Sequence, residues 1–259
     1  MSTKPTAAEK PVKIKTILIS QARPADENSP YFVMAKKYNL KIDFKPFIAI
    51  EPVPFREFRK QKINIMEFTA IVLTSKNAVD AFFGICKEAK LEMPPEMKYF
   101  CVTEQTANYL QKYIQVRKRK VFTGNKTVTD LFEYFNKQKT EKYLYPCSDI
   151  RRNDVVDHLR KIGASVQEGI MYHTVSADLS DIKPENYDVI AFFSPSGVDS
   201  LLKAFPGYEQ GATRLAALGP TTAQAIKEAG LHLDIEAPKP NAPSMAGAIE
   251  LFMKELGMK

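Results

Sequence analysis

Serine and threonine side chains recur in this sequence directly after short apolar runs and before helical patterns. At such positions a hydroxyl, together with the unpaired backbone N–H groups of a helix start, can donate hydrogen bonds to a carboxylate. Each is also a favourable helix cap in any protein, so a purely structural role is the alternative for each one taken singly. The residues are Ser75, Thr103, Thr106, Ser148, Ser194, Ser196, Thr221 and Thr222.

Two glycines accompany these hydroxyls and strengthen the interpretation as a ligand site. Gly197 and Gly219 lie in turns of the second half of the chain. They leave the backbone bare of a side chain where a ligand would approach it. Because matched hydroxyl turns occur in both halves, we expect the set to form an anion-binding edge.

An arginine and a tyrosine could contribute chemistry of other kinds. Arg151 follows Tyr145-Pro146-Cys147, where a guanidinium could hold a carboxylate; a solvated helix start is the alternative. Tyr172 lies in an apolar, β-rich segment, and a phenol with a pKa of about 10 is a proton donor, not a base, at neutral pH. The alternative for Tyr172 is a strand tyrosine packed against a neighbour.

Motifs for cofactors and metals are absent from the sequence. It has no G-x-G-x-x-G, no Lys-terminated phosphate loop and no G-x-S-x-G, which disfavours NAD, ATP and serine-hydrolase chemistry. Three cysteines without C-x-x-C spacing and three scattered histidines predict neither a disulfide framework nor a metal site. We therefore expect no metal, no cofactor and a reducing, cytoplasmic location.

Lys and Arg number 37 against 30 Asp and Glu, a net charge of +7, so an anionic partner is expected, either a nucleic acid or a polycarboxylate. The densest basic stretch, residues 112–126, lacks the repeated aromatics that stack on bases and predicts a solvated loop or edge strand. No apolar run approaches the roughly 20 residues of a membrane-spanning helix. Residues 1–12 predict a disordered tail without a secretory signal.

The elements that must position these residues alternate between strand and helix, which is typical of parallel α/β layers. Glycines 163, 230 and 257 stand where three of the helices should end. Strands are expected at 16–20, 42–50, 70–74, 99–102, 142–146, 189–193 and 214–218. Helices are expected at 31–38, 77–88, 106–113, 127–138, 154–162, 222–229 and 244–256.

An internal repeat indicates two similar α/β lobes. Residues 73–80 match 192–199 without gaps, and 101–107 match 217–223 in the same order. The pattern leaves two arrangements open: consecutive lobes near 13–128 and 129–259, or lobes that exchange their N-terminal units. In the second arrangement the chain would cross at 45–53 and 169–175, as a two-stranded linker with a cleft between the lobes.

These motifs together resemble the uroporphyrinogen-III synthase family over about residues 14–255. The resemblance rests on Leu73-Thr74-Ser75, Tyr172-His173-Thr174-Val175, Phe192-Phe193-Ser194-Pro195-Ser196-Gly197 and Ala217-Leu218-Gly219-Pro220-Thr221-Thr222-Ala223. Three positions depart from the family pattern. The arginine that commonly follows the first strand is displaced to Arg23, and Thr103 stands where the family usually has a glycine. Lys76-Asn77 stands where the family often has an arginine.

The resemblance implies an enzyme that cyclises hydroxymethylbilane, a polycarboxylate, to uroporphyrinogen III with inversion of ring D and loss of water. It implies a monomer that needs no cofactor, nucleic acid or membrane, with Tyr172 assisting departure of the hydroxyl. The hydroxyl turns, Gly197, Asn77 and Arg151 would bind the substrate carboxylates. A binding protein that closes on an anionic metabolite without catalysis is the alternative.

For the fold, the resemblance implies exchanged N-terminal units. One lobe would combine residues 13–47 with 176–259, and the other would span 51–170. Residues 48–50 and 171–175 would form the linker strands, and residues 1–12 the tail.

Overall fold

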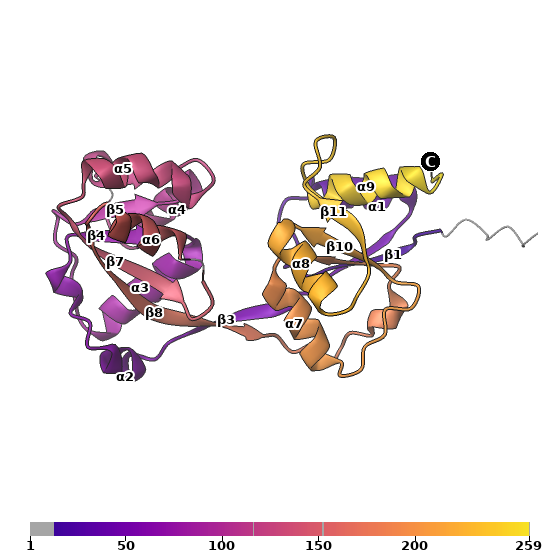
Figure 1. Ribbon diagram of the computed structural model, residues 1–259, viewed down its shortest axis with the longest axis horizontal. Helices are drawn as coiled ribbons and strands as arrows, with labels where there is room; N and C mark the ends of the chain where they lie inside the picture. Colours follow the sequence, from indigo (N-terminus) through magenta and orange to yellow (C-terminus); the bar gives the residue numbers. More distant parts are fainter. Residues whose placement is uncertain (1–12, 116, 152, 259) are drawn as a thin grey trace, which may run out of the picture. The chain divides into compact units, whose positions relative to one another are not determined.

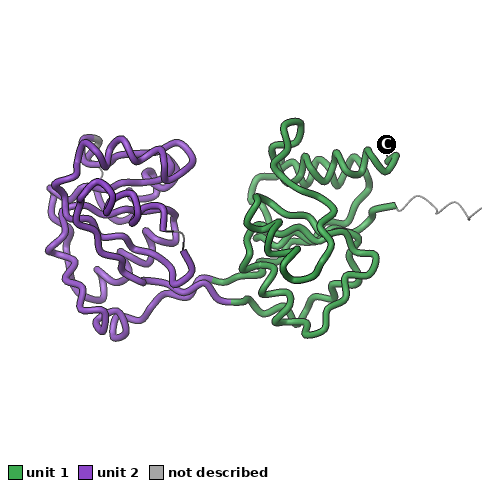
Figure 2. Tube along the Cα trace, in the orientation of Figure 1, with its two compact units in different colours: residues 1–49, 176–259 green, residues 50–175 purple. Residues whose placement is uncertain are grey.

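The computed structural model describes residues 13–115, 117–151 and 153–258; the tail expected at residues 1–12 lies outside them. The chain divides into two compact units (Figure 2). Unit 1 comprises Met1–Ala49 with Ser176–Lys259, and unit 2 comprises Ile50–Val175. Each unit has a parallel-dominated sheet between layers of helices (Figure 1), so the α/β fold class that the alternation predicts is confirmed.

Unit 1 is built on a five-stranded sheet of order β11-β10-β9-β1-β2, in which all four neighbouring pairs are parallel. Alternate strand residues face opposite sides: Ile17 packs with α1 and α9, whereas Leu18 packs with α7 and α8. Both faces are thereby buried, as parallel sheets require. The elements are β1 (Thr16–Ile19), α1 (Pro30–Tyr38), β2 (Lys41–Phe44), β9 (Val189–Phe192), α7 (Pro195–Ala204), β10 (Arg214–Leu218), α8 (Pro220–Glu228), β11 (Leu233–Ala237) and α9 (Met245–Glu255).

Unit 2 is built on a six-stranded sheet of order β3-β8-β7-β4-β5-β6. Ile71 and Leu73 face α2, α3 and α4, whereas Val72 faces α5 and α6. The elements are β3 (Ile48–Pro52), α2 (Phe55–Phe58), β4 (Ala70–Leu73), α3 (Lys76–Glu88), β5 (Lys98–Cys101), α4 (Glu104–Tyr109), β6 (Val121–Thr123), α5 (Phe132–Lys137), β7 (Lys142–Ser148), α6 (Asp154–Lys161) and β8 (Ser165–Ser176).

The single strand predicted over residues 42–50 is wrong. It divides after Phe44 into β2, which joins the sheet of unit 1, and β3, which pairs with β8 in the sheet of unit 2. The interruption has a physical cause, because Phe47 is fully buried in unit 1, edge-on to Phe192 at 5.8 Å between ring centroids. Pro46 also lacks the N–H that a continuous ladder would need.

Helix ends agree with the sequence signals better than helix starts do. Gly163, Gly230 and Gly257 have φ of 75°, 74° and 79°, the left-handed conformation expected after a helix, so the three predicted ends are confirmed. The helix predicted at 127–138 begins instead as a 3₁₀ turn, Val128–Leu131, before α5. The basic stretch 112–126 contains the edge strand β6, as expected. Among the described residues, no helix is long and apolar enough to cross a membrane.

Candidate functional site

Tyr172 is a buried aromatic residue of the expected site. It lies on β8 in unit 2 and is 8% exposed. Burial raises the pKa of its phenol, against the opposing effect of hydrogen bonding with the side chains of Ser75 and Thr74. The phenol therefore remains protonated at neutral pH and can donate a proton or a hydrogen bond.

Two cavities of unit 2 meet at Tyr172. The smaller, of about 400 Å³, is lined by Tyr172 together with Asn77, Asp80 and Glu88. The larger, of about 580 Å³, has a wall rich in hydroxyls and cations. Its polar lining residues are Thr74, Lys126, Thr127, Thr129, Tyr145, Ser148, Arg151, Asp154 and Tyr172 itself. The structure thus brings Tyr172, Ser148 and Arg151 together around the larger cavity, whereas Asn77 lines the smaller one with Tyr172.

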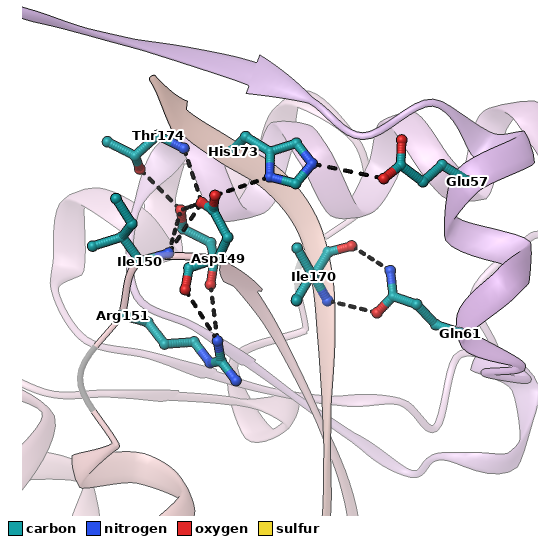
Figure 3. A network of polar contacts seen from close by, with 9 residues as sticks. Glu57, Gln61, Asp149, Ile150, Arg151, Ile170, His173 and Thr174 are labelled. Atoms are coloured by element: carbon teal, nitrogen blue, oxygen red, sulfur yellow. Dashed lines mark hydrogen bonds and ion pairs between the residues drawn. The ribbon is translucent and has the colours of Figure 1, made fainter. Parts of the chain in front are cut away.

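Arg151 is anchored as part of the wall of the larger cavity. Its Nε donates to Glu168 Oε1 at 2.6 Å. Its Nη1 donates to the carbonyl oxygens of Ser148 and Asp149 at 3.5 and 3.3 Å (Figure 3). The hydrogen bond to Glu168 raises the pKa of Arg151. The guanidinium expected to hold a substrate carboxylate therefore already has a protein carboxylate as its partner, which fixes its orientation.

Ser148 ends β7 at the same cavity and is 4% exposed. Its hydroxyl lies 2.8 Å from Asp149 Oδ1 and 2.9 Å from Thr174 Oγ1. This residue does not precede a helix as a cap, which was the structural alternative for it. It links the ends of two neighbouring strands, β7 and β8.

The sequence analysis did not identify Lys126 and Thr127, which lie on the loop after β6. The backbone N–H groups of Asn125, Lys126 and Thr127 all donate to Asp130 Oδ2, at 3.1, 2.8 and 2.9 Å. These hydrogen bonds lower the pKa of Asp130, and the one from the Thr127 N–H has the largest effect. The carboxylate holds the loop against the larger cavity, so Lys126 lies in its wall. The capping-box spacing of Thr127 and Asp130 is the signal that could have revealed the loop.

The first hydroxyl turns of unit 2 behave as helix caps. Ser75 Oγ accepts from the N–H of Ala78 at 3.2 Å at the start of α3, and Thr103 Oγ1 accepts from the N–H of Thr106 at 3.2 Å at the start of α4. Thr106, predicted as a contact, is 4% exposed and lies 3.0 Å from Thr103 between hydroxyl oxygens. Ser75 and Thr103 therefore serve as helix caps, and the Ser75 side chain also reaches Tyr172.

The turn after β9 in unit 1 repeats the Ser75 geometry. Ser194 Oγ accepts from the N–H of Gly197 at 3.2 Å and caps α7. Ser196 lies in the first turn of this helix and is half-buried, and its carbonyl oxygen accepts from Ser200 Oγ at 2.8 Å. Gly197 is buried, and an added Cβ would meet only ordinary contacts, the nearest with Ser194 Oγ at 3.6 Å. The glycine is thus not required by crowding.

The turn after β10 differs from the prediction. Gly219 itself is the residue before α8, with φ 83° and ψ 157°, so Thr221 and Thr222 lie inside the helix and not ahead of it. The side chain of Thr222 is buried, with 1% of the residue exposed, whereas Thr221 is exposed. Of the two, Thr221 is the hydroxyl that a ligand can reach.

Arg23 follows β1, the strand that lies next to β9 in the sheet of unit 1. Its guanidinium carbon stands 4.7 Å from the ring centroid of Phe32 and 5.9 Å from that of Phe44. The arginine displaced from its family position is thus held by two aromatic rings.

In the part of the chain that the structure describes, neither a reactive thiol nor a metal cluster accompanies these groups. Burial raises the pKa of the Cys147 thiol to about 12, so it is not a nucleophile at neutral pH. Over residues 13–115, 117–151 and 153–258, no group of three or more His, Cys, Asp or Glu side chains is placed to hold a metal ion.

Known proteins resemble this chain in fold and in sequence. Two solved structures share the fold over 93% of this chain: a uroporphyrinogen-III synthetase from Helicobacter pylori (TM-score 0.59, 18% identity, 100% of that chain) and a mutant uroporphyrinogen III synthase from Thermus thermophilus (0.57, 16%, 99%). The chain is also 23% identical to the uroporphyrinogen-III synthase of Schizosaccharomyces pombe, over 94% of this chain and 99% of the relative. The family model described as uroporphyrinogen-III synthase HemD matches residues 34–247. Because that match covers well over half of this chain, the chain belongs to the uroporphyrinogen-III synthase family.

Proposed function

We propose that this protein cyclises hydroxymethylbilane to uroporphyrinogen III with inversion of ring D and loss of water. Family membership supports the reaction. The observation that carries the assignment to particular residues is the protonated phenol of Tyr172, placed where two cavities of unit 2 meet.

The first step is departure of the terminal hydroxyl of the bilane. The pyrrole nitrogen of that ring stabilises the cation that remains, so the departure needs only a weak acid. Tyr172 supplies that proton or a strong hydrogen bond, because its phenol stays protonated while the side chain is nearly enclosed. The hydroxyl leaves as water, and the tyrosinate recovers a proton when the α-carbon that closes the macrocycle loses its hydrogen.

The harder task is to direct ring D to attack through its substituted carbon. That attack gives a spiro intermediate, which reopens and closes with ring D inverted, whereas unassisted closure gives the uninverted isomer. Selecting one geometry from a flexible chain is catalysis by orientation, and it requires several anchors on the substrate. The carboxylates of the bilane provide them.

We propose that the carboxylates bind at the helix starts and cavity walls of the two units. In unit 2, Arg151 and Lys126 contribute charge, and Ser148 contributes a hydroxyl at the larger cavity. The remaining proposed contacts, through hydroxyls, amides or backbone N–H groups, are Ser75, Asn77, Thr103, Thr106, Ser194, Ser196, Gly197, Thr221 and Thr222. Thr222, whose side chain is buried, would act through its backbone N–H. The N–H of Thr106 already donates to Thr103, so buried Thr106 would act by orienting Thr103.

We further propose that the protein works as a cytoplasmic monomer, without nucleic acid. Three buried, unpaired thiols, Cys86, Cys101 and Cys147, support a reducing location. The net charge of +7 suits a polycarboxylate substrate without invoking a nucleic acid.

The experiment is incubation with hydroxymethylbilane made in situ, with the rate of bilane loss and the isomer of the oxidised product measured together. An enzyme accelerates loss and yields type III. A protein that binds the bilane without catalysis slows its loss or leaves it unchanged, and the product is type I. The second outcome would refute the proposal.

A further inference from the structure

The strand that carries Tyr172 contains a β-bulge next to it. In the pairing of β7 with β8, Cys147 lies opposite Ile170 and Ser148 lies opposite Tyr172, so Met171 is an extra residue on β8. Successive side chains of a regular strand face opposite sides of the sheet. Here Met171 and Tyr172 are both buried in the same hydrophobic cluster. The bulge, and not the strand alone, therefore aims the phenol.

One side of the bulge is held by a glutamine side chain. Gln61 Nε2 donates to the carbonyl oxygen of Ile170 at 2.7 Å, and the N–H of Ile170 donates to Gln61 Oε1 at 2.9 Å (Figure 3). The amide thus replaces a neighbouring strand at this residue. One residue further along, the N–H of Val53 donates to the carbonyl oxygen of Met171 at 2.9 Å.

The other side of the bulge is held by a carboxylate and an imidazole. Asp149 Oδ1 accepts from the N–H of Thr174 at 3.0 Å, and Asp149 Oδ2 lies 3.1 Å from His173 Nδ1. The second ring nitrogen of His173 faces Glu57 Oε1 at 3.9 Å (Figure 3). Asp149 lies directly after Ser148, so this pair joins the end of β7 to the two residues that follow Tyr172.

We infer that Gln61 and the Asp149–His173 pair are positioning residues, which fix the bulge of β8 so that the Tyr172 phenol is aimed at the reacting bilane. The inference rests on the proposed function. A strand that slips by one residue turns its side chains to the opposite face of the sheet. Because the bulge is held on both sides, β8 cannot slip in this way, and the phenol stays at the cavities. None of these three side chains needs to touch the substrate.

The test is a double-mutant cycle with Tyr172→Phe, because a residue that acts through the phenol loses its effect once the phenol is gone. In the wild-type background, we expect His173→Ala and Gln61→Leu each to lower kcat by about tenfold with KM within about twofold. In the Tyr172→Phe background, each should lower kcat by less than about twofold. His173→Asn, whose amide nitrogen replaces Nδ1, should recover most of the loss.

Gln210→Leu is the matched control in unit 1. The Gln210 amide holds backbone in the same way, donating to the carbonyl oxygens of Thr213 and His232 at 2.9 and 3.0 Å and accepting from the His232 N–H at 2.7 Å. Its loss should reduce stability and leave kcat unchanged. Equal losses of kcat for Gln61→Leu or His173→Ala in both Tyr172 backgrounds would overturn the inference.

A second readout does not depend on turnover. With ¹³Cζ-labelled tyrosine, the Tyr172 resonance is identified as the one missing from Tyr172→Phe. His173→Ala and Gln61→Leu should move this resonance, and Gln210→Leu should not. A Tyr172 resonance that keeps its position in both His173→Ala and Gln61→Leu refutes the positioning role. A wild-type protein that forms no type III isomer refutes the proposed function instead.

Discussion

Replacing Tyr172 by phenylalanine removes the proposed acid and little else. The ring stays packed in the cluster that contains Met171, and only the hydroxyl near Ser75 and Thr74 is lost. A single hydrogen bond contributes about 1 kcal/mol to the free energy of unfolding, so the variant should remain folded. A general acid contributes about 10²–10⁴-fold to a rate. Because the pyrrole nitrogen already assists this departure, we expect kcat to fall by about ten- to a hundredfold, at or below the lower limit of that range.

The assay compares the initial rate of type III formation at saturating bilane with the free energy of unfolding in urea. Tyr143→Phe is the control, since Tyr143 is fully buried on the neighbouring strand β7 and its hydroxyl donates to the Gln138 carbonyl oxygen at 2.9 Å. Its loss should reduce stability by about 1 kcal/mol or more and leave kcat unchanged.

Wild-type turnover by Tyr172→Phe would refute the role of the phenol. An equal fall of kcat in Tyr143→Phe would show that the loss reflects folding and not chemistry. A rise in KM with kcat unchanged would show that Tyr172 binds the substrate without assisting the departure.

Three further predictions follow from particular residues. Gly219→Ala should destabilise unit 1 by about 2 kcal/mol, because φ is 83° there, although an added Cβ meets no atom within 4 Å. Gly197→Ala, inside α7, should leave the stability unchanged or increase it by up to about 1 kcal/mol, and urea unfolding midpoints distinguish the two variants. Lys126→Ala should raise KM by roughly fivefold, about 1 kcal/mol, with kcat unchanged in initial-rate measurements, because a cation is removed from the larger cavity. The hydrogen bond from Lys37 lowers the pKa of Glu250 to about 2 from 4.5, so this carboxylate stabilises the fold above pH 4.5 and its contribution is lost as pH falls towards 2. Because Lys37 is half exposed, we expect about 1 kcal/mol, and Glu250→Gln should remove that part of the pH dependence of urea unfolding.

The layered α/β fold could be predicted because its signals are local. Strand-like runs alternate with helical patterns, and glycines such as Gly163 and Gly230 end helices by adopting positive φ, which few other residues do without strain. The Ser and Thr residues at helix starts could be predicted for the same reason, because Ser75 and Ser194 cap helices directly after buried strands.

Features that depend on contacts distant in sequence could not be predicted. The bulge beside Tyr172 is fixed by Gln61, more than a hundred residues earlier in the chain. The break between β2 and β3 depends on where Phe47 is buried. The cluster of basic residues at 112–126 predicts only a solvated loop or edge strand. The role of Lys126 depends on the Asp130 carboxylate, which binds the backbone of its loop, and this contact is recognised only once the backbone geometry is known.

Isomer analysis at a low ratio of protein to bilane tests the central claim most directly. With one protein molecule per many substrate molecules, wild-type protein should convert nearly all the bilane to the type III macrocycle before spontaneous closure competes. If oxidation and chromatography reveal only the symmetric type I porphyrin, at the rate seen without protein, the protein does not invert ring D and the account fails.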